Sequence, residues 1–251
     1  SSSWRRSRTA AGKRSPLRTA GGTDPGGPME FEEWEPYYEQ VLREFGFSRS
    51  EDERAAEILD KQLGGTRLSP DQLAPLVADQ PVTVAGNAPR LEGELNRLTK
   101  VVIAADEATS ILLKHGRVPQ VIVTDLDGRI EDQIDANRRG AVAVVHAHGD
   151  NIPAIEQWAR RFPGKTFATT QSRPSERVHN FGGFTDGDRG VFLADAFGAR
   201  SIHLVGFDFE HPNPKDQPIA VKKRKLDWAY ILIQTVLAER EAFAEGADES
   251  P

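Results

Sequence analysis

The chain of 251 residues contains no cysteine, which excludes disulfide bonds and metal sites built on thiolates. It also lacks any apolar run near the ~20 residues that cross a bilayer, so we expect no membrane partner. No targeting segment is evident, and we therefore expect a soluble, cytoplasmic protein. The length fits one large α/β domain, with or without a helical annex.

Methionine is almost absent as well, since Met29 is the only one. It follows residues 1–28, which are rich in Ser, Gly, Thr and Pro and carry six basic residues against one acidic residue. Such a segment cannot bury a core, and we expect it to be disordered. We favour Met29 as the true start of translation over the alternative of a basic arm that binds nucleic acid. No nucleic-acid partner is therefore expected.

Lysine is scarce in the rest of the chain, with eight in residues 29–251. The whole chain has a net charge of −6. Abundant acid with little lysine fits a halophilic protein, because surface carboxylates keep proteins soluble in a high-salt cytoplasm. This pattern concerns habitat and carries no information about chemistry.

Two regions follow the basic segment. Apolar residues at helical spacing between Phe31 and Phe45, a capping pattern from Ser50 and another start at Ser69 predict a helical N-terminal annex over residues 29–80. Residues 81–251 alternate β-branched runs with amphipathic segments, which predicts a mostly parallel, Rossmann-like α/β sheet with helices on both faces. The predicted strands are 82–85, 101–105, 121–124, 141–145, 166–169 and 201–205, and a last long helix is predicted over 223–243.

The most informative segment is Val121-Ile-Val-Thr-Asp-Leu-Asp-Gly128. A buried strand ends there in two carboxylates, Asp125 and Asp127, which would share one face of an extended chain. Two carboxylates this close repel each other unless a cation lies between them. Magnesium is favoured because it takes oxygen ligands and shares its sites with phosphates. The alternative is an ordinary Asp-Gly turn.

Other predicted strands also end in polar or glycine-rich loops, and ligands of parallel sheets bind beyond those ends. The turn Gly86-Asn87-Ala88-Pro89 suits phosphate at a helix start, and Arg90 could add a bidentate contact. An ordinary tight turn is the alternative for this segment. Asp106 follows the second strand and is a further candidate for contacting the nucleotide.

The segment His146-Ala147-His148-Gly149-Asp150 allows two kinds of metal site. Alternate histidines on a strand would suit zinc and a metal hydrolase. We favour His146 as a core histidine and keep Asp150 as a third magnesium ligand beside the aspartate pair.

Two charged clusters lie further along the chain. Asp186 and Asp188 could hold a second metal, or Asp188 could cap a helix, and Arg189 could meet phosphate. Lys222, Lys223 and Lys225 form a dense basic cluster at a helix start, where positive charge opposes the helix dipole. That placement favours an anionic ligand such as a triphosphate over a solvated face.

These segments, taken in order, give the chain a recognisable pattern. Thr124–Gly128, His146–Asn151, Gly183–Arg189 and Gly206–Phe209 resemble the archaeal 6-hydroxymethyl-7,8-dihydropterin pyrophosphokinase (MptE-like) family, over roughly residues 80–240. That family is similar in turn to the catalytic domain of thiamine pyrophosphokinases. This chain departs from the pattern at Ala88 and Arg90 in the glycine turn, where relatives tend to carry Gly and Ser, and at Glu107 after the second strand, where they carry Gly.

The resemblance implies a magnesium-dependent kinase that transfers diphosphate from ATP to the pterin hydroxymethyl group, releasing AMP, in folate or methanopterin biosynthesis. The metal would lie on Asp125, Asp127 and Asp150, and the proton acceptor is left open among Asp186, Asp188 and His148. A related alcohol such as thiamine, or a non-catalytic nucleotide-binding module, is the alternative. The partners are small molecules, and the oligomeric state is left open, a homo-oligomer included.

Overall fold

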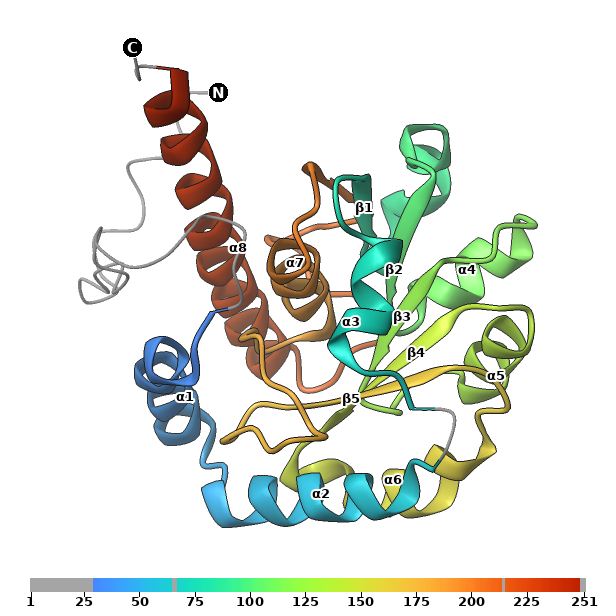
Figure 1. Ribbon diagram of the computed structural model, residues 1–251. Helices are drawn as coiled ribbons and strands as arrows, with labels where there is room; N and C mark the ends of the chain where they lie inside the picture. The colour runs from blue at the N-terminus through green and yellow to red at the C-terminus, as the bar shows by residue number, and fades with distance from the viewer. Residues whose placement is uncertain (1–28, 65–66, 214, 249–251) are drawn as a thin grey trace.

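The computed structural model describes residues 29–64, 67–213 and 215–248 (Figure 1). The expectation of disorder over residues 1–28 lies outside the described residues. In the part that is described, no helix is long and apolar enough to cross a membrane.

The centre of the fold is a six-stranded sheet whose paired strands are all parallel, in the order β5-β4-β3-β2-β1-β6. The strands are β1 (Pro81–Ala85), β2 (Val101–Ala105), β3 (Val121–Thr124), β4 (Val142–Ala147), β5 (Thr166–Thr170) and β6 (Ser201–Val205). The predicted α/β class is confirmed, and each predicted strand is present to within two residues at either end. Short β-branched runs buried on both faces are typical of such strands.

The helices cover both faces of this sheet (Figure 1). On one face, α1 (Phe31–Phe45), α7 (Asp186–Ala196) and α8 (Ile219–Asp248) share a core with alternate residues of the strands. On the other face lie η3 (Pro89–Arg97), α4 (Ala108–Lys114), α5 (Ile130–Arg138) and α6 (Ile152–Trp158). The segment Pro89–Arg97 is a 3₁₀ helix. Shorter elements are α3 (Pro70–Leu73), η2 (Ala74–Leu76), η4 (Gly149–Asn151) and η5 (Ala159–Arg161).

The N-terminal helices pack into the same cores as the sheet. Trp34 and Tyr38 of α1 are fully buried in the core around α7, and Leu59 of α2 (Arg49–Gln62) is fully buried in the core around α6. Helix α2 begins earlier than predicted, because Ser48 rather than Ser50 accepts the capping hydrogen bond, from the Glu51 backbone N–H. Both residues are serines, which suit the capping position equally well.

The strand order fixes where a ligand can bind. The chain moves outward from β1 to β5, then returns through α7 to place β6 on the free side of β1. After β1 the chain continues to η3 on one face of the sheet, and after β6 it continues to α8 on the other face. Such a switch point forms a crevice in open parallel sheets. The loops after β2 and β3 lie next to it.

Candidate active site

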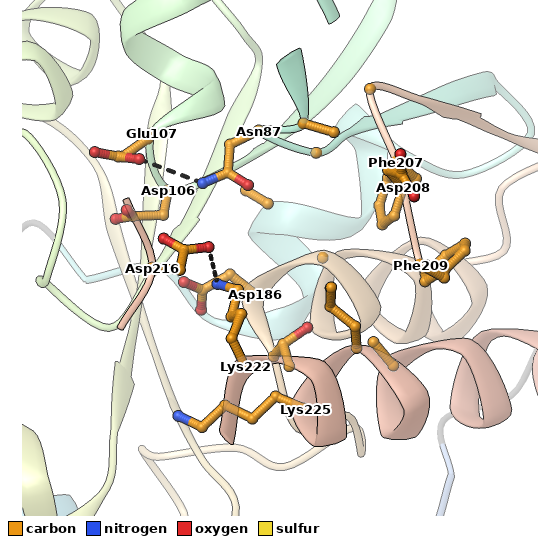
Figure 2. A pocket seen from close by; sticks show the side chains of 18 of the residues that line it. Asn87, Asp106, Glu107, Asp186, Phe207, Asp208, Phe209, Asp216, Lys222 and Lys225 are labelled. Carbon is orange, nitrogen blue, oxygen red and sulfur yellow. Dashed lines mark hydrogen bonds and ion pairs between the residues drawn. The ribbon is translucent and has the colours of Figure 1, made fainter. Parts of the chain in front are cut away.

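A cavity of about 300 Å³ opens at this switch point, between the strand ends and the first turns of α7 and α8 (Figure 2). It contains eight of the residues predicted from the sequence. These are Gly86, Asn87, Asp106, Asp125, Asp127, Asp186, Lys222 and Lys225. The predicted residues that do not line it are Arg90, Asp150, Asp188, Arg189 and Lys223.

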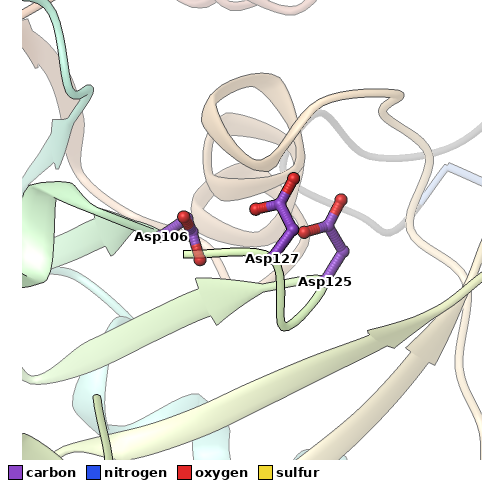
Figure 3. A group of neighbouring side chains, drawn as sticks. All are labelled: Asp106, Asp125 and Asp127. Carbon is purple, nitrogen blue, oxygen red and sulfur yellow. The ribbon is translucent and has the colours of Figure 1, made fainter. Parts of the chain in front are cut away.

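Three carboxylates gather in the cavity, those of Asp106, Asp125 and Asp127 (Figure 3). One oxygen of each lies within 4.8 Å of one oxygen of the others. The pair after β3 does not lie on an extended chain as the sequence suggested, because Leu126 between them has a φ of +67°. Leu126 is buried in the core with α2 and α6, and its backbone N–H donates to Thr124 Oγ1 at 2.9 Å. A left-handed turn anchored by this side chain therefore brings the two acids together.

Asp106 is the buried member of the cluster and follows β2 with a φ of +42°. Its Oδ1 accepts hydrogen bonds from Thr124 Oγ1 at 2.9 Å and from Gln133 Nε2 at 2.6 Å. Burial, together with the charge of Asp125, raises the pKa of Asp106 to about 6. Gly128 leaves room for this carboxylate, because a Cβ there would lie 2.1 Å from Asp106 Oδ2.

The two aspartates on either side of Leu126 have opposite pKa shifts: the pKa of Asp125 is lowered and that of Asp127 is raised. Burial raises the pKa of Asp125, but the His148 ring, 3.5 Å from its Oδ2, and the charge of Arg189 outweigh burial and hold it below its usual range. Loss of hydration and the charges of Asp125 and Asp106 raise the pKa of Asp127, although its side chain is the most exposed of the three. The cluster therefore resists full ionisation unless a cation compensates its charge.

The residues present fit a hard cation. All three side chains offer oxygen, which magnesium prefers. Asp125 Oδ1 is buried and has no hydrogen-bond partner among the described residues. An unpartnered buried carboxylate oxygen is costly, and a metal ligand bond would satisfy it.

The start of α7 supplies one acid to the cavity and keeps another out of it. Asp186 lines the cavity and pairs with Arg189, whose Nη1 lies 3.1 Å from Asp186 Oδ1. Burial and the charge of Asp125 raise the pKa of Asp186 well above its usual value. Asp188 is buried and accepts from the backbone N–H groups of Phe184 and Thr185 at 2.8 and 2.6 Å. It forms the capping box of α7, so the structure places it as a cap and not in the cavity.

The glycine turn after β1 packs against the turn after β6. A Cβ on Gly86 would lie 2.6 Å from the carbonyl oxygen of Gly206, and Gly206 has a φ of +71°. Asn87 reaches the cavity and donates to Glu107 Oε2 at 3.3 Å. Arg90 points elsewhere, since it is exposed and pairs with Glu94 at 2.8 Å. The predicted phosphate contact from Arg90 is therefore not supported by its position.

Two of the three predicted lysines face the cavity (Figure 2). Lys222 pairs with Asp216 at 3.1 Å, and Lys225 Nζ lies 5.7 Å from the centre of the Phe184 ring. Lys223 instead donates to the carbonyl oxygen of Phe209 at 3.1 Å and pairs with Asp227, outside the lining. One turn of α8 thus supplies two cations to the ligand space and one to the loop after β6.

The loop after β4 does not contribute Asp150. This residue is exposed on η4, and the sole group of metal-binding side chains found in the described part of the chain lacks it. The short 3₁₀ turn carries it away from the cavity, and Asp106 occupies the third position instead. His146 is a core histidine as expected, 2% exposed, with Nδ1 3.1 Å from Thr169 Oγ1. Burial lowers its pKa, and it forms no zinc site with His148 among these residues.

Several lining residues were not predicted from the sequence to be part of the site. Glu107, Asp208 and Asp216 add acidic groups, and Thr185 adds a hydroxyl. Glu107 follows β2 directly and pairs with Lys215 across the mouth of the cavity. Its position in the sequence, next to Asp106 at the end of a predicted strand, could have identified it as a site residue.

The geometry defines a class of protein, an α/β fold with an acidic, lysine-flanked cavity at the switch point of a parallel sheet. The chain belongs to the 6-hydroxymethylpterin diphosphokinase MptE-like family, whose model matches residues 65–214. The resemblance seen in the sequence motifs is thereby confirmed.

Three curated relatives are named 6-hydroxymethyl-7,8-dihydropterin pyrophosphokinase. The one from Pyrococcus furiosus is 48% identical over 188 residues, covering 72% of this chain and 79% of the relative. The one from Methanothermobacter thermautotrophicus is 46% identical, with the same two coverages. The one from Methanocaldococcus jannaschii is 34% identical over 229 residues, covering 82% of this chain and 95% of the relative. The archaeal origin of these relatives agrees with the expectation from the sequence.

Proposed function

We propose that this protein is a 6-hydroxymethyl-7,8-dihydropterin diphosphokinase that transfers diphosphate from ATP to the pterin hydroxymethyl group. The observation that carries the proposal is the carboxylate cluster of Asp106, Asp125 and Asp127 at the switch point of a chain with three relatives of that name. A pterin diphosphate is the product, as folate or methanopterin biosynthesis requires.

In the reaction, the hydroxymethyl oxygen forms a bond to the β-phosphorus of ATP and the bond to the α-phosphate oxygen breaks. AMP leaves, and the hydroxyl proton passes to a base. Magnesium held by Asp106, Asp125 and Asp127 would neutralise charge on the phosphate oxygens. Lys222 and Lys225 offset further negative charge, because both line the cavity and belong to the first turns of α8.

Asp186 is the best-placed proton acceptor. It lines the cavity, and its raised pKa makes the carboxylate a stronger base than an ordinary aspartate. Asp188 is committed to capping, and His148 is held against Asp125.

The lining offers room for two substrates. Phe207 and Phe209 lie on the wall opposite the acidic cluster, with ring centroids 5.5 Å apart, and suit the flat pterin ring (Figure 2). A wider cavity of about 700 Å³ adjoins the first and shares Asn87, Glu107 and Lys215 with it. The first cavity alone is small for both a nucleotide and a pterin, and the adjoining cavity offers further space for one of the two substrates.

The deciding experiment supplies ATP, magnesium and a panel of acceptor alcohols that includes the pterin and thiamine. We expect AMP and pterin diphosphate from the pterin only. ADP as the only nucleotide product, or faster turnover with thiamine, would refute the proposal.

A further inference from the structure

A buried carboxylate of the N-terminal annex lies behind the acidic site. Asp52 of α2 is 2% exposed and accepts three hydrogen bonds. Tyr38 Oη donates to Oδ2 at 2.7 Å, Gln171 Nε2 to Oδ2 at 2.8 Å, and the Gly149 backbone N–H to Oδ1 at 2.7 Å. Burial and the hydrogen bond to Asp52 raise the pKa of Tyr38, which therefore stays a donor. All three donors are neutral, so the carboxylate is held by directed hydrogen bonds rather than by an ion pair.

One branch from Asp52 leads to Asp186. Gln171 donates to Asp52 with its amide nitrogen, and its Oε1 accepts from Arg189 Nη2 at 3.2 Å. Arg189 in turn donates to Asp186, which lines the cavity. Since Asp52 can only accept, it fixes the orientation of the Gln171 amide and leaves the oxygen to face Arg189.

The second branch leads to Asp125. Gly149, held by Asp52, follows His148, whose ring contacts Asp125. The helix and this loop are in direct contact, because a Cβ on Gly149 would lie 2.7 Å from Glu51 Cβ. The loop after β4 therefore takes its position from the first turn of α2.

We infer that Asp52 is a positioning residue for the proposed diphosphotransfer, which fixes Asp186 through Gln171 and Arg189 and fixes Asp125 through the Gly149 loop. The inference rests on the proposed function. The family match begins at residue 65, so Asp52 and the helix α2 that carries it precede the match. The annex thereby becomes part of the catalytic apparatus in addition to covering the sheet.

The test compares Asp52→Asn with Asp195→Asn. Asp195 is also buried, 7% exposed, and its Oδ1 accepts from Arg240 Nη1 at 2.6 Å away from the cavity. Asparagine at 52 places its amide nitrogen either at the Oδ2 position, where it faces the donors Tyr38 and Gln171, or at the Oδ1 position, where it faces the Gly149 N–H, so it releases either Gln171 or Gly149. We expect the kcat of Asp52→Asn to fall about tenfold or more and its Mn²⁺ affinity, measured by calorimetry, to weaken by a similar factor. Asp195→Asn should lower the melting temperature and leave both quantities within about twofold of the wild type, per folded molecule.

A second variant covers the case in which Asp52→Asn does not fold. Gln171→Met keeps the backbone carbonyl that accepts from Trp34 and Asn180 but removes the link from Asp52 to Arg189. We expect it to lower kcat while the KM for the pterin changes little. Wild-type kcat and Mn²⁺ affinity in Gln171→Met, or in a folded Asp52→Asn, would overturn the inference. If the wild type itself yields no AMP from the pterin, the proposed function fails, and Mn²⁺ binding still reports on positioning.

Discussion

At the residue scale, the cavity brings together several carboxylates, and their negative charge lowers the stability of the folded protein. Asp106, Asp125 and Asp127 lie together, and Asp186 joins them at the start of α7. The pKa values of Asp106, Asp127 and Asp186 are all raised, so each carboxylate is less stable ionised in the folded chain than in the unfolded chain. Such destabilised sites are retained where chemistry needs them.

Asp125→Asn should abolish most of the activity. The variant loses one formal charge and one candidate ligand oxygen, and we expect AMP formation to fall about 10²-fold or more. The matched control is Asp150→Asn, since Asp150 is exposed and does not line the cavity. Equal losses in both variants would restore Asp150 to the site and contradict the geometry.

Asp106→Asn should stabilise the metal-free protein while inactivating it. Asp106 has a pKa of about 6 in the folded chain against 3.8 for an unperturbed aspartate, so its ionisation costs stability above pH 6. The cost disappears as the pH falls from about 6 to about 4, because the folded protein then binds the proton first. We expect the free energy of unfolding in chelator to rise by about 3 kcal/mol at pH 8 and by less at pH 5. A gain that is equal at both pH values would contradict this account.

At the element scale, the first turn of α7 has two roles: Asp188 caps the helix, and Asp186 is placed in the cavity. Asp188 caps the helix with both oxygens, and Asp186, two residues earlier, faces the cavity. Gly187 between them leaves room for Phe207, since a Cβ there would lie 2.8 Å from Phe207 Cε1. A capping role and a ligand-facing role therefore fall on neighbouring aspartates.

Asp188→Ala should act on stability rather than on chemistry. Loss of the capping box should lower the free energy of unfolding by about 2 kcal/mol, measured by urea denaturation. Asp188→Asn keeps one acceptor and should lose less. A folded Asp188→Ala protein whose kcat falls as far as that of Asp125→Asn would show that Asp188 takes part in the reaction.

The helices and strands were largely predictable from the sequence. Which loops and side chains lie next to one another in the folded chain was not. Runs such as Val121–Thr124 are apolar and β-branched, and this local signal specifies a buried strand. Whether Asp106 or Asp150 completes the cluster depends on which loop turns toward β3. The sequence does not show that η4 carries Asp150 outward or that Asp106 takes a positive φ. The roles of Asp188 and Arg189 were likewise decided by partners in the folded chain.

At the scale of the whole molecule, the annex and the sheet form shared cores. Trp34 donates through Nε1 to the carbonyl oxygen of Gln171, 137 residues away, and Leu59 packs in the core with Ile155. Contacts of this range leave no local pattern in a single sequence. The predicted division at residue 80 stays a prediction, and the shared cores argue against independent folding of the part after it.

A truncated variant that begins at Arg67 should not fold. It would lose buried side chains such as Trp34, Tyr38 and Leu59, each worth about 1.5–3 kcal/mol, against a net stability of only about 5–15 kcal/mol for a typical domain. Near-ultraviolet circular dichroism and urea denaturation provide the measurement. A cooperative transition in the truncated variant would show that the annex is dispensable for folding.

Magnesium should stabilise the whole molecule, because it relieves the repulsion among the clustered acids. At a concentration about 100 times its Kd, a bound ion adds about 2.7 kcal/mol to the free energy of unfolding. We expect a higher melting temperature in magnesium than in chelator, and no such difference in Asp125→Asn. An equal shift in both proteins would assign the effect to ions bound elsewhere.

The left-handed turn at Leu126 has a consequence for heat tolerance. The distance between Asp125 and Asp127 depends on the side chain of Leu126, which is buried with α2 and α6. Warming that loosens this packing would spread the acids before the sheet melts, since local openings cost less than global unfolding. The temperature optimum of catalysis should then lie below the midpoint of denaturation, and a rate profile recorded beside a calorimetric scan would reveal the gap.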